Sequence, residues 1–454
     1  MSSSLDAIFD PKSIAIVGAS REEGKTGNVV MKNIIDAGYS KALFPINPKA
    51  DEILGVKAYP SLDAVPDPID LAVIIVPSKF VPSVMEQCAK KNVRGIIIIS
   101  GGFAEAGKEG EELQRYVIDI AKRSGMRLVG PNCQGVNNPH SNMCASWPLI
   151  REKGPIAIIS QSGTVGATIE CWAKDDGIGI SKFVALGNKG DVNELDLIEY
   201  FVEDPSSRVI SVYLEGVSDG KRFMDIARKS VRKKPILMIK GGRTEAGARA
   251  VMSHTRSLAG NDKIFSAAFR QTGVIRVDNL EEFYDASKAL SYLQLPKGRR
   301  ALIVTSSGGS AILATDACES EGIKLPSLDN DLFQQLSQSI PPRCILKNPL
   351  DLTGDADSPR YETVLKEAIK NPSYDAFITI FGDPIPGATE MIQNLRKTTE
   401  KPIIVVYLGG GDVEKEESMK MHRLGIPVFR TPERAVKALS CLIRYGEFLR
   451  QNPF

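Results

Sequence analysis

Residues 13–27, SIAIVGASREEGKTG, begin with a run of Ile and Val and turn through glycine and serine toward a stretch with helical periodicity. Two later stretches follow the same plan, PIAIISQSGTVGA at residues 155–167 and RALIVTSSGGSAIL at residues 300–313. Apolar runs of this kind are typical of buried parallel strands, and strands that alternate with helices predict doubly wound sheets. The sequence therefore predicts three consecutive α/β domains.

The predicted domain boundaries fall in segments rich in turn-forming or charged residues. NNPHSNMCASWPLIREKGP contains the first boundary and LQLPKGRR the second. We expect the domains to span residues 1–148, 149–295 and 296–454.

The composition argues against several classes of partner. Fifty-seven Lys and Arg stand against 55 Asp and Glu, a formal net charge of +2, which predicts no affinity for nucleic acid or anionic membranes. The amino-terminal segment lacks a signal sequence, and no apolar run reaches the length of a membrane span. We expect a cytoplasmic protein whose seven cysteines are buried free thiols, among them Cys88, Cys171 and Cys318.

Several strand ends of the first unit converge on the edge where ligands of doubly wound sheets bind. Gly18-Ala19-Ser20 leads through Lys25 into a helix whose free N–H groups favour phosphate, although the loop is not GxGxxG. The second strand ends in Asn47-Pro48-Lys49, which suits a phosphorylated ribose better than the acidic residue of an NAD site. Any one of these loops taken alone could be an ordinary tight turn. The remaining ends are Val76-Pro77-Ser78, Ser100-Gly101-Gly102 and VGPNCQGV.

The second unit contains a predicted phosphate cradle. Its residues stand between the strand IAIIS and a helix, so that several N–H groups and two hydroxyls would face one anion. Glu215 ends a later strand, where its carboxylate either supports an imidazole or is an ordinary solvated charge. The residues of the cradle are Ser160, Gln161, Ser162 and Gly163.

The chain has three histidines. His140 follows a proline in a predicted loop and His422 lies in a polar stretch, so we expect both to be exposed to solvent. His254 differs, because it follows the strand PILMIKGG in a predicted long loop of Gly, Ala, Ser and Thr. Such a histidine is either a solvated residue or a nucleophile that attacks phosphorus and forms an N-phosphoryl intermediate.

The order of these motifs resembles a known family. VGAS, FPINPK, VPS, SGGF and VGPNCQG are similar, in order, to the CoA-binding domain of succinyl-CoA synthetase and the ADP-forming acetyl-CoA synthetases. The resemblance implies a Rossmann-like domain that holds coenzyme A rather than NAD. It assigns the nucleotide part and pantetheine to Gly18, Ala19, Ser20, Lys25, Asn47, Pro48, Lys49, Val76, Pro77 and Ser78. It places Ser100, Gly101, Pro131 and Asn132 nearer the thiol.

SQSGT, GNKGD, YLEG, KGGRT and SHT resemble the ligase domain of the same family. The resemblance implies that His254 is phosphorylated, that Glu215 supports it, and that Ser162 and Gly163 hold the phosphate. It implies two flavodoxin-like domains after the Rossmann-like one. The last of these, residues 296–454, is present in the ADP-forming acetyl-CoA synthetases and absent from the short succinyl-CoA synthetase subunit.

The resemblance also implies a partner. No segment shows the glycine-rich loop and carboxylates of an ATP-grasp fold or a GxxxxGK[ST] motif. The resemblance implies a separate ATP-grasp β subunit, in a hetero-oligomer such as an α2β2 heterotetramer that binds ADP or ATP and Mg²⁺ mainly on the partner. No metal site is assigned to this chain. The implied reaction interconverts acyl-CoA, ADP and phosphate with carboxylic acid, CoA and ATP, as in an acetate–CoA ligase.

Two other functions stay open at this point. One is an NAD(P)-dependent oxidoreductase that uses the first domain, although the GxGxxG motif and the ribose carboxylate are absent. The other is a CoA-binding module without catalysis. Tight binding of CoA without NAD would separate the first from a synthetase, and phosphate chemistry lost with His254 would exclude the second.

Overall fold

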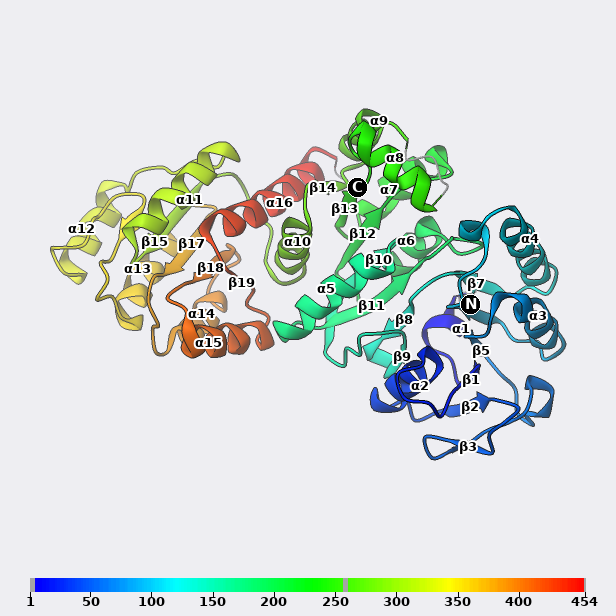
Figure 1. Ribbon diagram of the computed structural model, residues 1–454. Helices are drawn as coiled ribbons and strands as arrows, with labels where there is room; N and C mark the ends of the chain where they lie inside the picture. The colour runs from blue at the N-terminus through cyan, green and yellow to red at the C-terminus, as the bar shows by residue number, and fades with distance from the viewer. Residues whose placement is uncertain (1–4, 256–259, 453–454) are drawn as a thin grey trace. The chain divides into compact units, whose positions relative to one another are not determined.

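The structure is a computed structural model that describes residues 5–255 and 260–452, without the side chains of residues 252–255. Helices and strands alternate along the chain, and the strands form three main sheets flanked by helices (Figure 1). This arrangement confirms the predicted α/β fold of three consecutive sheets. The chain divides into two compact units, Met1–Asp175 with Gly179–Arg276 and Asp176–Ile178 with Val277–Phe454.

The first unit contains the first two sheets. The strands of the first sheet are β1 (Ser13–Val17), β2 (Ala42–Ile46), β5 (Leu71–Ile74), β6 (Gly95–Ile98) and β7 (Arg127–Val129). They are all parallel, in the order β2-β1-β5-β6-β7. Successive strands are added on opposite sides of β1, so the order reverses between β1 and β5, where ligands of doubly wound sheets bind.

The strands of the first sheet are apolar because helices cover both of its faces. Every residue of β1, β5 and β6 is buried. Ile74 and Ile98 from the sheet share one core with Met85 and Val117 from the covering helices. The helices are α1 (Asp6–Phe9), α2 (Thr26–Asp36), α3 (Val81–Lys90) and α4 (Lys108–Arg123), and a small hairpin of β3 (Glu52–Ile53) and β4 (Val56–Lys57) follows β2.

The second sheet is mixed. Its strands are β8 (Gly135–Asn138), β9 (Met143–Ala145), β10 (Lys153–Ser160), β11 (Ile180–Ala185), β12 (Val209–Leu214), β13 (Ile236–Lys240) and β14 (Ile275–Val277), in the order β14-β13-β12-β10-β11-β8-β9. β8 and β9 are antiparallel to each other, and β8 is antiparallel to β11. The expected first domain, residues 1–148, includes these two strands, whereas they extend the second sheet.

Five helices of the described part of the chain accompany the second sheet. Most of them follow a parallel strand directly, as the alternating pattern predicts. They are α5 (Gly163–Asp175), α6 (Glu194–Glu203), α7 (Gly220–Val231), α8 (Glu245–Thr255) and α9 (Asp262–Thr272).

The second unit contains the third sheet. Its strands are parallel in the order β16-β15-β17-β18-β19, with bounds β15 (Ala301–Thr305), β16 (Leu350–Asp351), β17 (Ala376–Phe381), β18 (Ile403–Tyr407) and β19 (Val428–Phe429). α10 belongs to this unit, although the expected second domain extends to residue 295. The helices are α10 (Leu280–Tyr292), α11 (Gly308–Ser320), α12 (Asn330–Ser339), α13 (Ser358–Lys370), α14 (Ala388–Arg396), α15 (Gly411–Arg423) and α16 (Pro432–Gln451).

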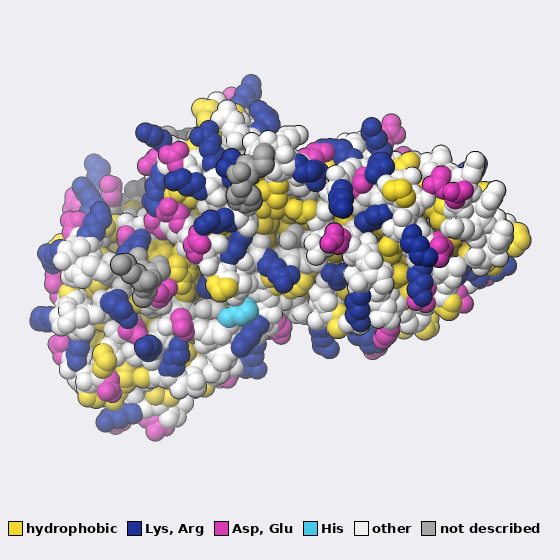
Figure 2. Space-filling model, turned by 180° about the vertical axis from the view of Figure 1, so that it is seen from behind, with side chains coloured by type: hydrophobic (Ala, Val, Ile, Leu, Met, Phe, Trp, Pro, Cys, Tyr) yellow, Lys and Arg dark blue, Asp and Glu magenta, His cyan; other side chains and the backbone are white. Residues whose placement is uncertain are grey.

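The structure also tests the expectations about surface charge, membrane spans and burial of the cysteines. On the face shown in Figure 2, basic and acidic side chains are interspersed, in keeping with the small net charge. Within residues 5–255 and 260–452, no helix is long and apolar enough to cross a membrane. Cys88 and Cys318 are buried as expected, but the expectation for Cys171 is wrong, because it lies on the solvent side of α5.

Candidate functional site

The loop between β1 and α2 depends on two glycines. Gly18 has a φ of +96°, and a Cβ there would lie 2.3 Å from the carbonyl oxygen of Ile75. A Cβ at Gly27, in the first turn of α2, would lie 2.1 Å from the carbonyl oxygen of Gly18. The start of α2 therefore lies directly against the end of β1, where its free N–H groups are available to an anion.

The ends of β1 and β2 are tied together by side chains. Asn47 Nδ2 donates to the carbonyl oxygen of Ala19 at 2.8 Å, and Asn47 Oδ1 accepts from the N–H of Lys49 at 2.8 Å. Arg21 adds a bond of 2.7 Å to the carbonyl oxygen of Lys49. Arg21 is a cation that is not among the residues predicted from the sequence, although it directly follows Ser20 in the loop. Lys25 lies in the same loop and pairs with Glu22 at 2.7 Å.

The predicted thiol end forms a second group at the same edge. Ser100 Oγ donates to the carbonyl oxygen of Val76 at 2.6 Å, and the N–H of Asn132 donates to the carbonyl oxygen of Ser100 at 2.9 Å. A Cβ at Gly101 would lie 3.1 Å from Asn132 Oδ1. The structure thus brings the predicted CoA residues to the carboxyl ends of one sheet, and their contact with CoA stays a prediction.

Gln161 organises the corresponding edge of the second sheet. Its Oε1 accepts from the N–H groups of Glu215 at 2.6 Å and Gly216 at 3.2 Å, and its Nε2 donates to the carbonyl oxygen of Gly216 at 3.0 Å. Ser160 is fully buried, and its Oγ donates to the carbonyl oxygen of Ser162 at 2.5 Å. Gln161 and Ser160 therefore shape the turn, while Ser162 and Gly163 reach its accessible side at the start of α5.

Glu215 is a buried carboxylate with an unused acceptor. It is 5 % exposed, which excludes the alternative of a solvated strand-end charge. Its Oε1 accepts from the Tyr213 hydroxyl at 3.4 Å, and burial together with this carboxylate raises the pKa of Tyr213 to about 12. Among the described side chains, Glu215 Oε2 has no hydrogen-bond partner. Buried polar oxygens normally accept a hydrogen bond, and an imidazole N–H is a suitable donor for this one.

A buried lysine lies near Glu215. Lys240, the last residue of β13, is 1 % exposed, and its Nζ donates to the carbonyl oxygen of Gly241 and lies 4.9 Å from the centre of the Phe265 ring. Burial lowers its pKa, and the charges of Asp262 and Glu215 oppose that effect. Lys240 is not among the residues predicted from the sequence, because a lysine that ends an apolar strand gives no signal of burial.

The structure changes the expectations for the histidines. His254 belongs to the last turn of α8, so the predicted loop is wrong for residues 245–255, and the His254 side chain lies outside the described ones. His140 is exposed as predicted. His422 is 7 % exposed, contrary to expectation, because its Nε2 accepts from the N–H of Val428 at 3.1 Å and its Nδ1 lies 2.9 Å from the carbonyl oxygen of Asp176.

The carboxyl edges of the two sheets adjoin each other within the first unit. The segment after β11 runs along the end of β7 and the loop that follows it, with N–H donors at residues 188, 190 and 192. They bond the carbonyl oxygens of Pro131 at 2.9 Å, Gly130 at 2.8 Å and Leu128 at 3.0 Å. The N–H of Leu186 also donates to the carbonyl oxygen of Ser160 at 2.8 Å, so the loop after β11 contacts both the predicted thiol end and the predicted phosphate cradle.

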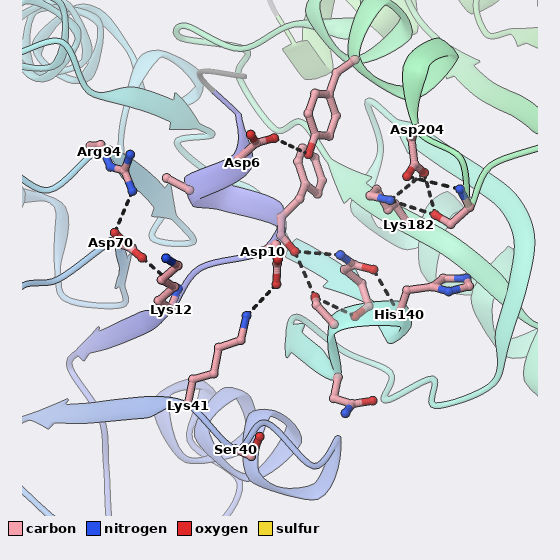
Figure 3. A pocket seen from close by; sticks show the side chains of 17 residues that line it. Asp6, Asp10, Lys12, Ser40, Lys41, Asp70, Arg94, His140, Lys182 and Asp204 are labelled. Carbon is pink, nitrogen blue, oxygen red and sulfur yellow. Dashed lines mark hydrogen bonds and ion pairs between the residues drawn. The ribbon is translucent and has the colours of Figure 1, made fainter. Parts of the chain in front are cut away.

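A cavity of about 870 Å³ lies at the opposite edge of the first sheet. Figure 3 shows its charged lining, in which Lys41 pairs with Asp10 at 2.7 Å and Arg94 with Asp70 at 2.9 Å. Because these residues precede the strands, the cavity is remote from the carboxyl edges, and we assign it no role in the chemistry.

In the described part of the chain, no group of three or more His, Cys, Asp or Glu side chains is placed to hold a metal ion.

Comparison with known proteins decides the family. The chain is 41% identical to acetate–CoA ligase [ADP-forming] I subunit alpha of Pyrococcus furiosus, and the alignment covers 98% of both chains. The chain belongs to the ADP-forming acyl-CoA synthetase family. Three family profiles match this synthetase chain, a CoA binding domain at residues 12–139, a succinyl-CoA ligase like flavodoxin domain at 153–290 and a ligase-CoA domain at 301–447. The resemblance inferred from the motifs is confirmed.

Solved structures agree with this assignment. Acetyl-coenzyme A synthetase 1 of Candidatus Korarchaeum cryptofilum, in complex with phosphate and ADP, matches with a TM-score of 0.92 and 36% identity over 99% of both chains. The synthetase chain spans only 64% of acetate–CoA ligase [ADP-forming] I of Archaeoglobus fulgidus, to which it is 40% identical. The family therefore includes both chains of this length and longer chains. The comparisons support the synthetase over the oxidoreductase.

Proposed function

We propose that this chain is the CoA-binding, catalytic subunit of an acyl-CoA synthetase (ADP-forming) and that acetate is a substrate. The observation that carries the proposal is the junction of the two carboxyl edges, where a Cβ on Gly163 would lie 2.9 Å from Oε1 of Gln134, two residues beyond Asn132. In the proposed reaction, a thioester carbonyl and a phosphate meet at this junction. The matching profiles and the names of the relatives support the same chemistry.

In the first step, an oxygen of inorganic phosphate attacks the carbonyl carbon of acyl-CoA. The C–S bond breaks, a phosphate proton goes to the leaving sulfur, and CoA and an acyl phosphate result. Ser162 and Gly163 hold the phosphoryl group at the start of α5, where backbone N–H groups and the helix dipole stabilise its charge. The residues of the first sheet hold the CoA so that the thioester carbonyl faces this turn.

In the second step, an imidazole nitrogen of His254 attacks phosphorus. The bond between phosphorus and the acyl oxygen breaks, the carboxylate leaves, and an N-phosphohistidine forms. Glu215 Oε2 accepts the N–H of the other ring nitrogen, which fixes the tautomer and stabilises the positive charge of the ring. In the third step, a terminal oxygen of ADP takes the phosphoryl group, the P–N bond breaks, and ATP forms.

The nucleotide site belongs to a partner in this proposal. We place ADP or ATP on an ATP-grasp β subunit, together with Mg²⁺, which neutralises phosphate charge when it is bound there. The greater length of the Archaeoglobus relative supports this division, because a longer single chain has room for a second function. We propose an α2β2 heterotetramer, which the mass of the purified complex tests.

Phosphorylation tests the role of His254. The complex with its β subunit is incubated with Mg²⁺ and γ-labelled ATP, and the label on this chain is tested for lability in acid and stability in base. We expect label on the wild type and on His140→Ala, which changes an exposed histidine, and none on His254→Ala. Equal label on His254→Ala would remove that residue from the mechanism. No label on any protein, with an active β subunit, would favour a CoA-binding module.

A further inference from the structure

The loop between β11 and α6, residues 186–193, contacts the carboxyl edges of both sheets in the first unit. Two consecutive side chains make these contacts, Asn188 toward the first sheet and Lys189 toward the second. Lys189 has a φ of +53°, the left-handed conformation that few residues other than glycine adopt. This conformation turns the chain between the two residues and lets adjacent side chains serve different edges.

Asn188 holds the loops of the predicted thiol end. Its Nδ2 donates to Glu105 Oε2 at 2.6 Å and to Gln114 Oε1 at 2.9 Å, and its Oδ1 accepts from Asn132 Nδ2 at 3.3 Å. Glu105 Oε1 in turn accepts from the N–H of Gly102 at 2.6 Å. Burial opposes the charge of Glu105, but hydrogen bonds from Asn188 and the backbone hold its pKa below the ordinary value. The loops after β6 and β7 are thus fixed through one amide.

Lys189 contacts the carboxyl edge of the second sheet. Its Nζ donates to the carbonyl oxygen of Gly216 at 3.0 Å, next to Glu215, and lies 3.3 Å from Glu194 Oε2. The Glu194 side chain is 1 % exposed, and its Oε2 also accepts from Gln161 Nε2 at 3.2 Å. A carboxylate this deeply buried needs a paired cation, so loss of the ammonium would leave Glu194 uncompensated beside the residue that orders the turn.

We propose that Asn188 and Lys189 are positioning residues that set the separation between the CoA thiol and the phosphoryl site. Asn188 fixes the thiol side and Lys189 fixes the side of Glu215 and Gln161. This inference rests on the proposed function. Reacting groups must be held within a fraction of an ångström, and a displacement of about 1 Å lowers a rate by about 100-fold. A short, doubly anchored loop meets that requirement better than a flexible linker.

Two reactions of the complex separate the two roles. Formation of ATP from acetyl phosphate and ADP uses the phosphoryl side without CoA, whereas formation of ATP from acetyl-CoA, phosphate and ADP uses both sides. We expect Lys189→Met to slow both reactions by about 100-fold with little change in the KM for CoA. Asn188→Asp keeps the shape of the side chain but sets a carboxylate against Glu105. It should slow only the CoA-dependent reaction and raise the KM for CoA.

Matched variants control for folding. Lys233→Met removes an ion pair with Glu203 in which both side chains are more than half exposed, and it should leave both reactions unchanged. Lys189→Arg keeps the charge and should retain more activity than Lys189→Met. If Lys189→Met does not fold, Glu194→Gln tests the same bridge with a side chain of the same shape.

The outcomes are distinct. Equal effects of the Asn188 and Lys189 variants on both reactions would overturn the inference and leave the loop a purely structural element. A wild-type rate in Lys189→Met would also overturn the inference. If that variant does not fold, a wild-type rate in Glu194→Gln would have the same meaning. Failure of the wild-type complex to form ATP from acetyl phosphate would instead contradict the proposed function.

Discussion

The substitution Gly27→Ala tests whether the close approach of α2 to β1 shapes the predicted CoA site. A Cβ at this position would lie 2.1 Å from the carbonyl oxygen of Gly18, which is backbone and cannot rotate away. Carbon–oxygen contacts are normally about 3.3 Å or longer, so the start of the helix must move by about 1 Å. Alanine in place of a helical glycine raises the free energy of unfolding by about 0.5–1 kcal/mol, whereas overpacking lowers it by about 1–3 kcal/mol.

The steric term is the larger one, so we expect a net loss of about 1 kcal/mol in the free energy of unfolding, measured by urea denaturation. CoA binding, measured by calorimetry, should weaken about fivefold, because a displaced helix start loses about 1 kcal/mol of its interaction with phosphate. Gly220→Ala is the matched control, since Gly220 begins α7 and a Cβ there would meet nothing within 4 Å. If Gly27→Ala is as stable as this control and binds CoA normally, the reasoning is refuted.

Two further predictions concern Glu215 and His422. Glu215→Gln removes the charge that supports the imidazolium, and we expect ATP formation from acetyl phosphate and ADP to slow about 100-fold with unchanged CoA affinity; a rate near that of the wild type would exclude this role. Burial, and secondarily the charge of Lys288, lowers the pKa of His422 from 6.5 to about 4. Between these two pH values the unfolded chain therefore binds a proton at this residue and the folded protein does not. Stability from this group is complete above pH 6.5 and declines as the pH falls toward 4, by at most about 3 kcal/mol. Urea midpoints at pH 7.5 and 5 should therefore differ less in His422→Gln than in the wild type, and an equal difference in the two proteins would contradict the assignment.

The sequence predicted the parallel sheets well because their strands are buried on both sides. In β1 and β6, for example, every residue is buried, so the apolar run alone marks the strand. The loops of the first sheet could also be placed, since the carboxyl ends of parallel strands meet at one edge. This is why Gly18, Asn47 and Ser100 come together as the sequence indicated.

Other elements could not be predicted from local patterns. Glycine, serine and threonine around His254 suggested a loop, but alanines at residues 246, 248 and 250 favour the helix, and Thr244 Oγ1 accepts from the N–H of Gly247 at 3.1 Å. β8 contains Asn137 and Asn138, which are poor strand formers and are fully or almost fully buried. Asn138 Nδ2 donates to the carbonyl oxygen of Phe9 at 2.7 Å, a partner far away in the sequence. Burial of His422 likewise depends on contacts that no local pattern encodes.

The pairing of β8 with β11 limits where this chain can be cut. β8 follows the Pro131–Asn132 loop after only two residues, so the polypeptide passes from the first sheet to the second without a linker. A fragment that ends at residue 148 would carry β8 and β9 without the sheet they extend, and the remainder would expose β11 as an open edge. Open edges pair with other chains and promote aggregation. We therefore expect the first two domains to be expressed and purified as one piece.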